Sequence, residues 1–128
     1  MDERTTRHLE SALRAHSGRS VRVGVLDDST LRVVLDPTGD RGRVDVLATG
    51  ADSRWTVSDR GATGALHGLD LDFVISKLAA FDTQLTRRGD ELVADTDDRS
   101  LAEAVAAFVD TLEFVPVLVG LYANDLAA

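Results

Sequence analysis

Hydrophobic and polar residues alternate through four short stretches in the first half of the chain, with the period of two that is typical of half-buried strands. The stretches cover residues 21–25, 30–35, 44–48 and 55–58. Turn-forming residues follow each of them, such as the Pro and Gly of Asp36-Pro37-Thr38-Gly39-Asp40. Because parallel neighbours need a long crossover and these connections are short, the pattern predicts a four-stranded antiparallel meander.

Apolar residues at helical spacing predict a helix before this sheet and another after it. The first, over residues 2–16, has only Leu9 and Leu13 as strong anchors, so we expect it to lie thinly across an edge or one face of the sheet. The second, over residues 71–82, follows Asp70, a residue type that caps helix N-termini. Both helices are expected to pack their apolar side on the strands.

The last third of the chain predicts a small hairpin and a long closing helix. Leu85 on one side and Leu92 and Val93 on the other flank the turn Arg87-Arg88-Gly89-Asp90, which predicts the hairpin. Ser100-Leu101-Ala102-Glu103 forms a capping box that starts the helix. The apolar face of this helix extends to Tyr122. Since Pro116 lacks a backbone N–H, a kink or a restart is expected there.

Together these elements predict a single α+β domain over residues 1–128. We expect an N-terminal helix, a four-stranded antiparallel meander, a helix, a small C-terminal hairpin and a long closing helix packed on one sheet face. The length suits one domain with a real core, and the absence of cysteine excludes disulfides and thiolate metal sites. The fold therefore rests on packing.

The net charge of the chain limits the classes of partner that we expect it to bind. With 22 acidic and 14 basic side chains the net charge is −8, which opposes broad binding to nucleic acid or to an anionic membrane. The polar N-terminus Met1-Asp2-Glu3-Arg4 lacks the apolar core of a signal peptide, so a cytoplasmic protein is expected. The longest apolar run, residues 114–123, is shorter than the roughly 20 residues of a membrane span, so no membrane anchor is expected.

The most pointed group of chemical side chains is Ser58-Asp59-Arg60-Gly61, after the fourth predicted strand. A carboxylate beside an arginine and a glycine could bind a ligand or act as a base, although Asp and Gly in this order are also typical of a plain turn. His67 could approach Asp59 and form the acid–base pair of a hydrolase-type enzyme. No residue is assigned as catalytic.

No metal or cofactor is predicted. The three histidines, including His8 and His16 on the first helix, lack the spacing of a metal motif. A nucleophile elbow and a phosphate-binding P-loop are also missing from the sequence. The sequence therefore points away from the common cofactor-dependent enzymes.

Arg87 and Arg88 suggest an alternative function. A helix over residues 71–82 followed by a hairpin with two arginines at its turn is similar to a recognition helix with a wing, in which guanidinium groups contact phosphate. Acidic residues at both ends of the helix and beside the arginines argue against this winged-helix nucleic-acid protein.

The segment Trp55-Thr56-Val57-Ser58-Asp59-Arg60-Gly61 carries a family resemblance. It resembles an uncharacterised family of small bacterial, archaeal and phage domains, a domain of unknown function, in which an aromatic-x-hydrophobic-Thr/Ser-Asp-x-Gly turn links strands to a helix and a short hairpin. The resemblance extends from Val21 to Tyr122, with Ser58 in place of the more usual Thr. It implies an order of elements and a setting in mobile-element or defence loci, without an activity.

The apolar end of the closing helix suggests the function that we expect. Segments this apolar are covered by the core or by a partner. We therefore expect a non-enzymatic protein–protein interaction or regulatory domain that forms homodimers or binds a protein partner. The residues expected at this interface are Val115, Val117, Leu118, Leu121 and Tyr122.

Overall fold

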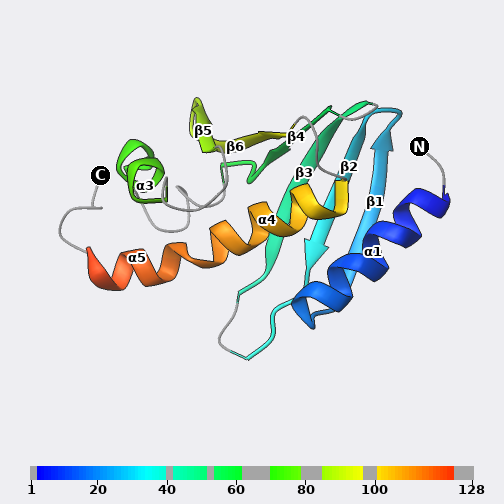
Figure 1. Ribbon diagram of the computed structural model, residues 1–128, viewed down its shortest axis with the longest axis horizontal. Helices are drawn as coiled ribbons and strands as arrows, with labels where there is room; N and C mark the ends of the chain where they lie inside the picture. Colours follow the sequence, from blue (N-terminus) through cyan, green and yellow to red (C-terminus); the bar gives the residue numbers. More distant parts are fainter. Residues whose placement is uncertain are drawn as a thin grey trace.

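The computed structural model describes residues 3–39, 42–51, 54–61, 70–78, 85–96 and 101–122. They form an α+β domain in which helices cover one face of an antiparallel sheet (Figure 1). The strands are β1 (Val21–Asp27), β2 (Thr30–Leu35), β3 (Val44–Ala51), β4 (Arg54–Ser58), β5 (Leu85–Arg88) and β6 (Glu91–Thr96). The helices are α1 (Glu3–Ser17), α3 (Leu71–Leu78), α4 (Leu101–Glu113) and α5 (Val115–Leu121).

The sheet has six strands in the order β1-β2-β3-β4-β6-β5, so the prediction of a four-stranded sheet is wrong. The meander β1–β4 and the hairpin β5–β6 both form as predicted, but the hairpin joins the meander. Ser58 of β4 lies opposite Val93 of β6, and Val57 lies opposite Ala94. This pairing satisfies the backbone groups that β4 would otherwise expose as an edge strand.

One face of the sheet forms the core with the four helices that the structure describes. Strand side chains alternate between the two faces, and those on the helix side of the central strands β2 to β4 are mostly buried, whereas Val25 near the end of β1 is 49 % exposed. Phe108 of α4 is the largest fully buried side chain among the described residues. The core includes Leu9, Leu13, Leu31, Val33, Val46, Val57, Val74, Leu92, Phe108, Val115 and Leu118. The opposite face, which carries Arg32 and Asp45 and which we call the open face, is mostly polar, although Val34, Ser58 and Val93 on it are buried.

The ends of α1 and α3 follow the sequence signals. Gly18, with a positive φ of 69°, follows α1, and its N–H donates to the carbonyl of Arg14. At α3 the Asp70 carboxylate accepts from the N–H groups of Asp72 and Phe73, which confirms the predicted cap. The predicted end of this helix near Asp82, the irregular turn over 62–69 and the Ser100 cap lie outside the described residues.

The closing helix restarts where proline predicts it. α4 ends at Glu113, and α5 begins at Val115 with Pro116 in its first turn, where a missing N–H leaves no helical bond unmade. Leu101–Leu121 as a whole is long and apolar enough to cross a membrane, a length that the run 114–123 alone did not suggest. In this chain the stretch also supplies core side chains on both sides of the break, so apolarity alone does not distinguish the two roles.

Candidate functional site

The turn after β4 is held from inside by Asp59. Its side chain is buried, and Oδ1 accepts hydrogen bonds from the N–H of Gly61 at 2.8 Å and from the N–H of Leu92 at 2.9 Å. The N–H of Asp59 donates to the carbonyl of Leu92 at 3.1 Å. Asp59 thus ties the end of β4 to β6 through one oxygen of its carboxylate.

The same turn directs Arg60 to the surface. Arg60 has a positive φ of 60°, and Gly61 follows with a φ of 80°. An arginine in this left-handed region costs roughly 1 kcal/mol that glycine would not. Ser58 helps to hold it there, because its Oγ accepts from the N–H of Arg60 at 3.0 Å and donates to Glu91 at 3.1 Å. The Arg60 side chain is 45 % exposed.

Three arginines gather around one carboxylate on the open face, a group that we call the Asp45 cluster. Arg32 of β2 binds both oxygens of Asp45, Nε to Oδ1 at 3.0 Å and Nη2 to Oδ2 at 2.5 Å. Arg43 lies 3.7 Å from Oδ2, and Arg60 lies 3.7 Å from Oδ1. Three positive charges and one negative charge leave this group with a net charge of +2 on a chain whose net charge is −8.

The arginines set the protonation of this carboxylate. The hydrogen bond from Arg32 is the largest effect that lowers the pKa of Asp45 from its ordinary 3.8, and the charges of Arg32, Arg60 and Arg43 add to it, while burial opposes them. In return, Asp45 raises the pKa of Arg32. The lowered pKa keeps the Asp45 carboxylate ionised at neutral pH.

The two hairpin arginines already have partners within the chain. Arg87 donates to the carbonyl of Gly89 at 2.6 Å and lies 3.2 Å from a carboxylate oxygen of Asp72. Arg88 donates to Glu91 at 3.1 Å. The hairpin also pairs with β4 and so forms the edge of the main sheet.

The histidines do not come together in the described residues. His67 lies outside them, so the Asp59–His67 pair has no geometry here. His16 of α1 lies 2.8 Å from Asp110 of α4 and links the two helices. Among the side chains that the structure describes, no three His, Cys, Asp or Glu residues form a group that could hold a metal ion.

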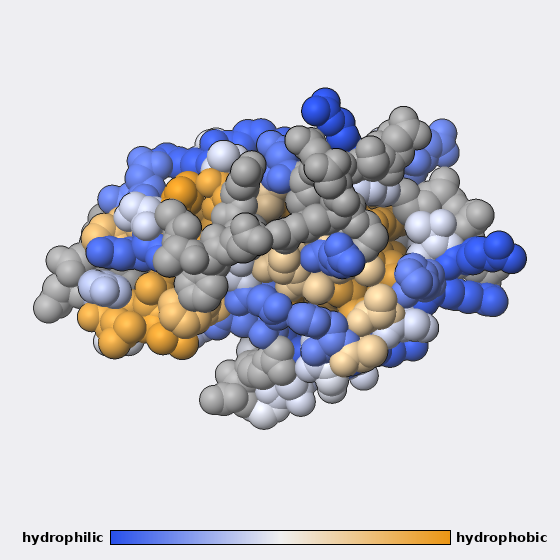
Figure 2. Space-filling view, viewed as in Figure 1, coloured by the Kyte–Doolittle hydropathy of each residue, from blue (hydrophilic) through white to orange (hydrophobic). Residues whose placement is uncertain are grey.

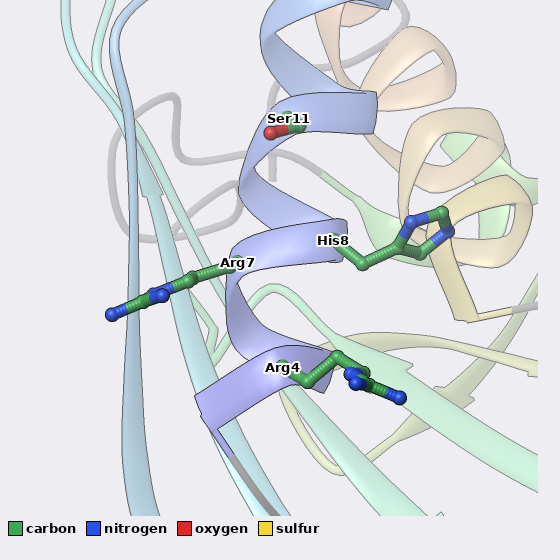
Figure 3. Close-up of a pocket in the computed structure, with 4 residues that line it drawn as sticks. All are labelled: Arg4, Arg7, His8 and Ser11. Atoms are coloured by element: carbon green, nitrogen blue, oxygen red, sulfur yellow. The ribbon is translucent and has the colours of Figure 1, made fainter.

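A hollow of about 490 Å³ on α1 is lined by Arg4, Arg7, His8 and Ser11. Figure 3 shows that Arg7 points to one side of the helix, whereas Arg4 and His8 point to the other. All four residues come from a single helix, and the three basic side chains do not converge on a common point. The hollow therefore lacks the geometry of a built binding site.

The predicted interface residues divide between core and surface. Val115 and Leu118 are buried in the core of the chain itself. Val117 is 47 % exposed and Leu121 is 68 % exposed, and hydrophobic residues gather over α5 at the lower left of Figure 2. Tyr122 is half-buried, with its ring 5.9 Å from that of Phe73. An interface at α5 would thus use Val117, Leu121 and the edge of Tyr122.

No family model, curated protein or solved structure matches the chain. The resemblance at Trp55–Gly61 therefore stays a prediction. Sequence reasoning singled out Arg60 but missed Arg32, Arg43 and Asp45 as its neighbours. Arg32 and Asp45 occupy the polar positions of two alternating strands, which was a usable signal, but the strand register is needed to place them side by side.

Proposed function

We propose that the protein is a non-enzymatic interaction domain that forms a homodimer through α5. The observation that carries this proposal is the outward face of α5, where Pro116, Val117, Gly120 and Leu121 are all exposed and all nonpolar. Exposed large apolar residues that gather on one face mark interaction sites. Val117 and Leu121 are four residues apart, so they lie one above the other on the helix.

A second copy of the chain is the partner that we favour. A two-fold dimer places the same patch on both subunits, so an uncharged apolar helix can pack against its own copy without charge complementarity. α5 contains no charged residue, which keeps the centre of such an interface free of repulsion between two acidic chains. The same acidity opposes insertion of this helix into an anionic bilayer.

Sedimentation velocity over a range of protein concentrations tests the dimer. The native chain is expected to sediment as a dimer that dissociates on dilution. Leu121→Asp and Val117→Asp should each give a monomer at every concentration, because a buried unpaired charge is costly at an interface. Both residues are exposed, so the folded monomer should keep its stability.

A matched control is available on the edge strand β1. Leu26 is 57 % exposed, comparable with Leu121, and its strand β1 lies at the other end of the molecule from α5 in Figure 1. Leu26→Asp should leave the dimer intact. A native chain that stays monomeric throughout, or a dimer that Leu26→Asp dissociates and Leu121→Asp does not, would refute the proposal.

The alternative functions have less support in the geometry. The carboxylate of Asp59 is buried and bound to backbone N–H groups, which does not favour a hydrolase-type enzyme built on it. Arg87 and Arg88 are paired with acidic side chains, which does not favour a winged-helix contact with nucleic acid. The homodimer is thus the candidate that the exposed residues favour.

A further inference from the structure

The Asp45 cluster has more hydrogen-bond donors than its one carboxylate can use. Arg32 alone occupies both oxygens of Asp45 in a forked pair. Arg43 and Arg60 lie 3.7 Å from the carboxylate, beyond hydrogen-bonding distance, each nearest to a different oxygen. Within the described part of the chain, neither guanidinium donates a hydrogen bond, so both keep their donors for another acceptor.

We propose that the Asp45 cluster binds the terminal phosphate of a small phosphorylated molecule. A phosphomonoester carries a charge of about −1.5 to −2 at pH 7, which matches the net charge of the cluster. Planar guanidinium groups present paired N–H donors at the spacing of phosphate oxygens. The side chains of Arg43 and Arg60 are 52 % and 45 % exposed, so a ligand reaches them without a change of fold.

The backbone of Arg60 gives independent support. A non-glycine residue in the left-handed region is strained, and such strain persists only where surrounding bonds impose it. Here Asp59 fixes the turn from the core side, and Ser58 holds the N–H of Arg60. An arginine that served only solubility would not need this position. The turn instead fixes Arg60 beside Asp45, where it completes the cluster.

A small phosphate ester fits this face better than a polynucleotide does. Single-stranded nucleic acids stack their bases on aromatic side chains. Trp55 is the one aromatic residue in the six described strands, and it belongs to the core on the other face. The net charge of −8 also opposes a long polyanion, whereas one phosphate needs only the local charge of the cluster.

The test is titration of the full chain with inorganic phosphate and with glycerol 3-phosphate, followed by NMR of backbone and arginine side-chain signals. Saturable binding with millimolar affinity or tighter is expected, with shifts at Arg32, Arg43 and Arg60. Two variants each remove one guanidinium. Arg60→Asn uses a residue type that tolerates the left-handed backbone at this position, and Arg43→Gln changes a residue outside the turn. Each variant should weaken binding about tenfold.

Arg22→Gln is the matched control, since Arg22 lies on the same face but pairs with Asp36 at 2.9 Å, outside the cluster. It should bind phosphate like the native chain. Absence of saturable binding, binding unchanged in both cluster variants, or equal loss in Arg22→Gln would each overturn the proposal. So would binding of an oligonucleotide without a terminal phosphate when both phosphate probes fail.

Discussion

Replacing Asp59 by alanine separates a structural role of this residue from a catalytic one. The carboxylate oxygen Oδ1 accepts hydrogen bonds from the N–H groups of Gly61 and Leu92 at 2.8 and 2.9 Å, and both bonds are buried. Alanine leaves no acceptor at this point. Two backbone donors would then be shut off from water and from any partner, at the junction of β4 and β6.

The expected loss follows from these two bonds. A buried donor left without an acceptor costs about 1–3 kcal/mol, so Asp59→Ala should lower the free energy of unfolding by about 2–6 kcal/mol. This is a large part of the roughly 5–15 kcal/mol that stabilises an ordinary domain. Asp59→Asn keeps a side-chain carbonyl oxygen at the position of Oδ1 and should lose much less.

Urea unfolding followed by circular dichroism measures both variants against the native chain, with unchanged slopes confirming a two-state comparison. The order of stability should be native, then Asp59→Asn, then Asp59→Ala. If alanine is as stable as aspartate, or if asparagine is as damaging as alanine, the accepting oxygen is not what holds the turn. The reasoning from the two bonds would then be wrong.

Two further substitutions, each paired with a control, test other contacts of the fold by the same urea unfolding measurement. Arg19→Met should lower the free energy of unfolding by about 3–5 kcal/mol, because this fully buried guanidinium pairs with Glu113, the last residue of α4, at 2.6 Å and binds loop carbonyls. The control Arg22→Met removes an exposed ion pair and should lower it by less than about 1 kcal/mol. Gly50→Ala should lower the free energy of unfolding by about 1–3 kcal/mol, because a Cβ there would clash with the carbonyl oxygen of Arg54. In the control Gly24→Ala the new Cβ meets open space, so stability should change by less than about 0.5 kcal/mol. Equal losses within either pair would contradict the contact on which it rests.

Local patterns were enough to predict most individual elements. Alternation predicted β1 to β4, the turn at Arg87–Asp90 predicted the hairpin, and apolar spacing predicted α1, α3 and α4. Asp70 and Pro116 marked a helix start and a helix restart, because a cap and a missing N–H act on their immediate neighbours. These signals depend only on residues a few positions away, which is why one sequence contains them.

The join between meander and hairpin depends on distant residues instead. β4 and β6 pair across more than 30 positions, as Ser58 opposite Val93 shows, and no short pattern records which two strands meet. An unpaired outer edge on β4 was the available hint. The interface prediction grouped residues that the fold separates for a related reason: Val115 and Leu118 continue the buried face of α4 across the break, whereas Val117 and Leu121 are exposed.

The turn after β4 shows how one short motif serves two sides of a sheet. Successive residues at the end of a strand point to opposite faces, so neighbours in the sequence need not share a site. Asp59 is buried and binds backbone, whereas Arg60 reaches the Asp45 cluster at the surface. Sequence reasoning placed the two in a single candidate site. In the fold, the buried carboxylate holds the turn that places Arg60, so Asp59 is structural and only Arg60 reaches the surface.

The two proposed surfaces lie on opposite sides of the sheet. Val33 and Val46 face the helices. Arg32 and Asp45 immediately precede these two valines on the same strands, so they face away from the helices. α5 continues from α4 on the helix side (Figure 1). A dimer formed through α5 would therefore leave both copies of the Asp45 cluster open to solvent. Phosphate binding and self-association can fail or succeed separately, because no described residue takes part in both.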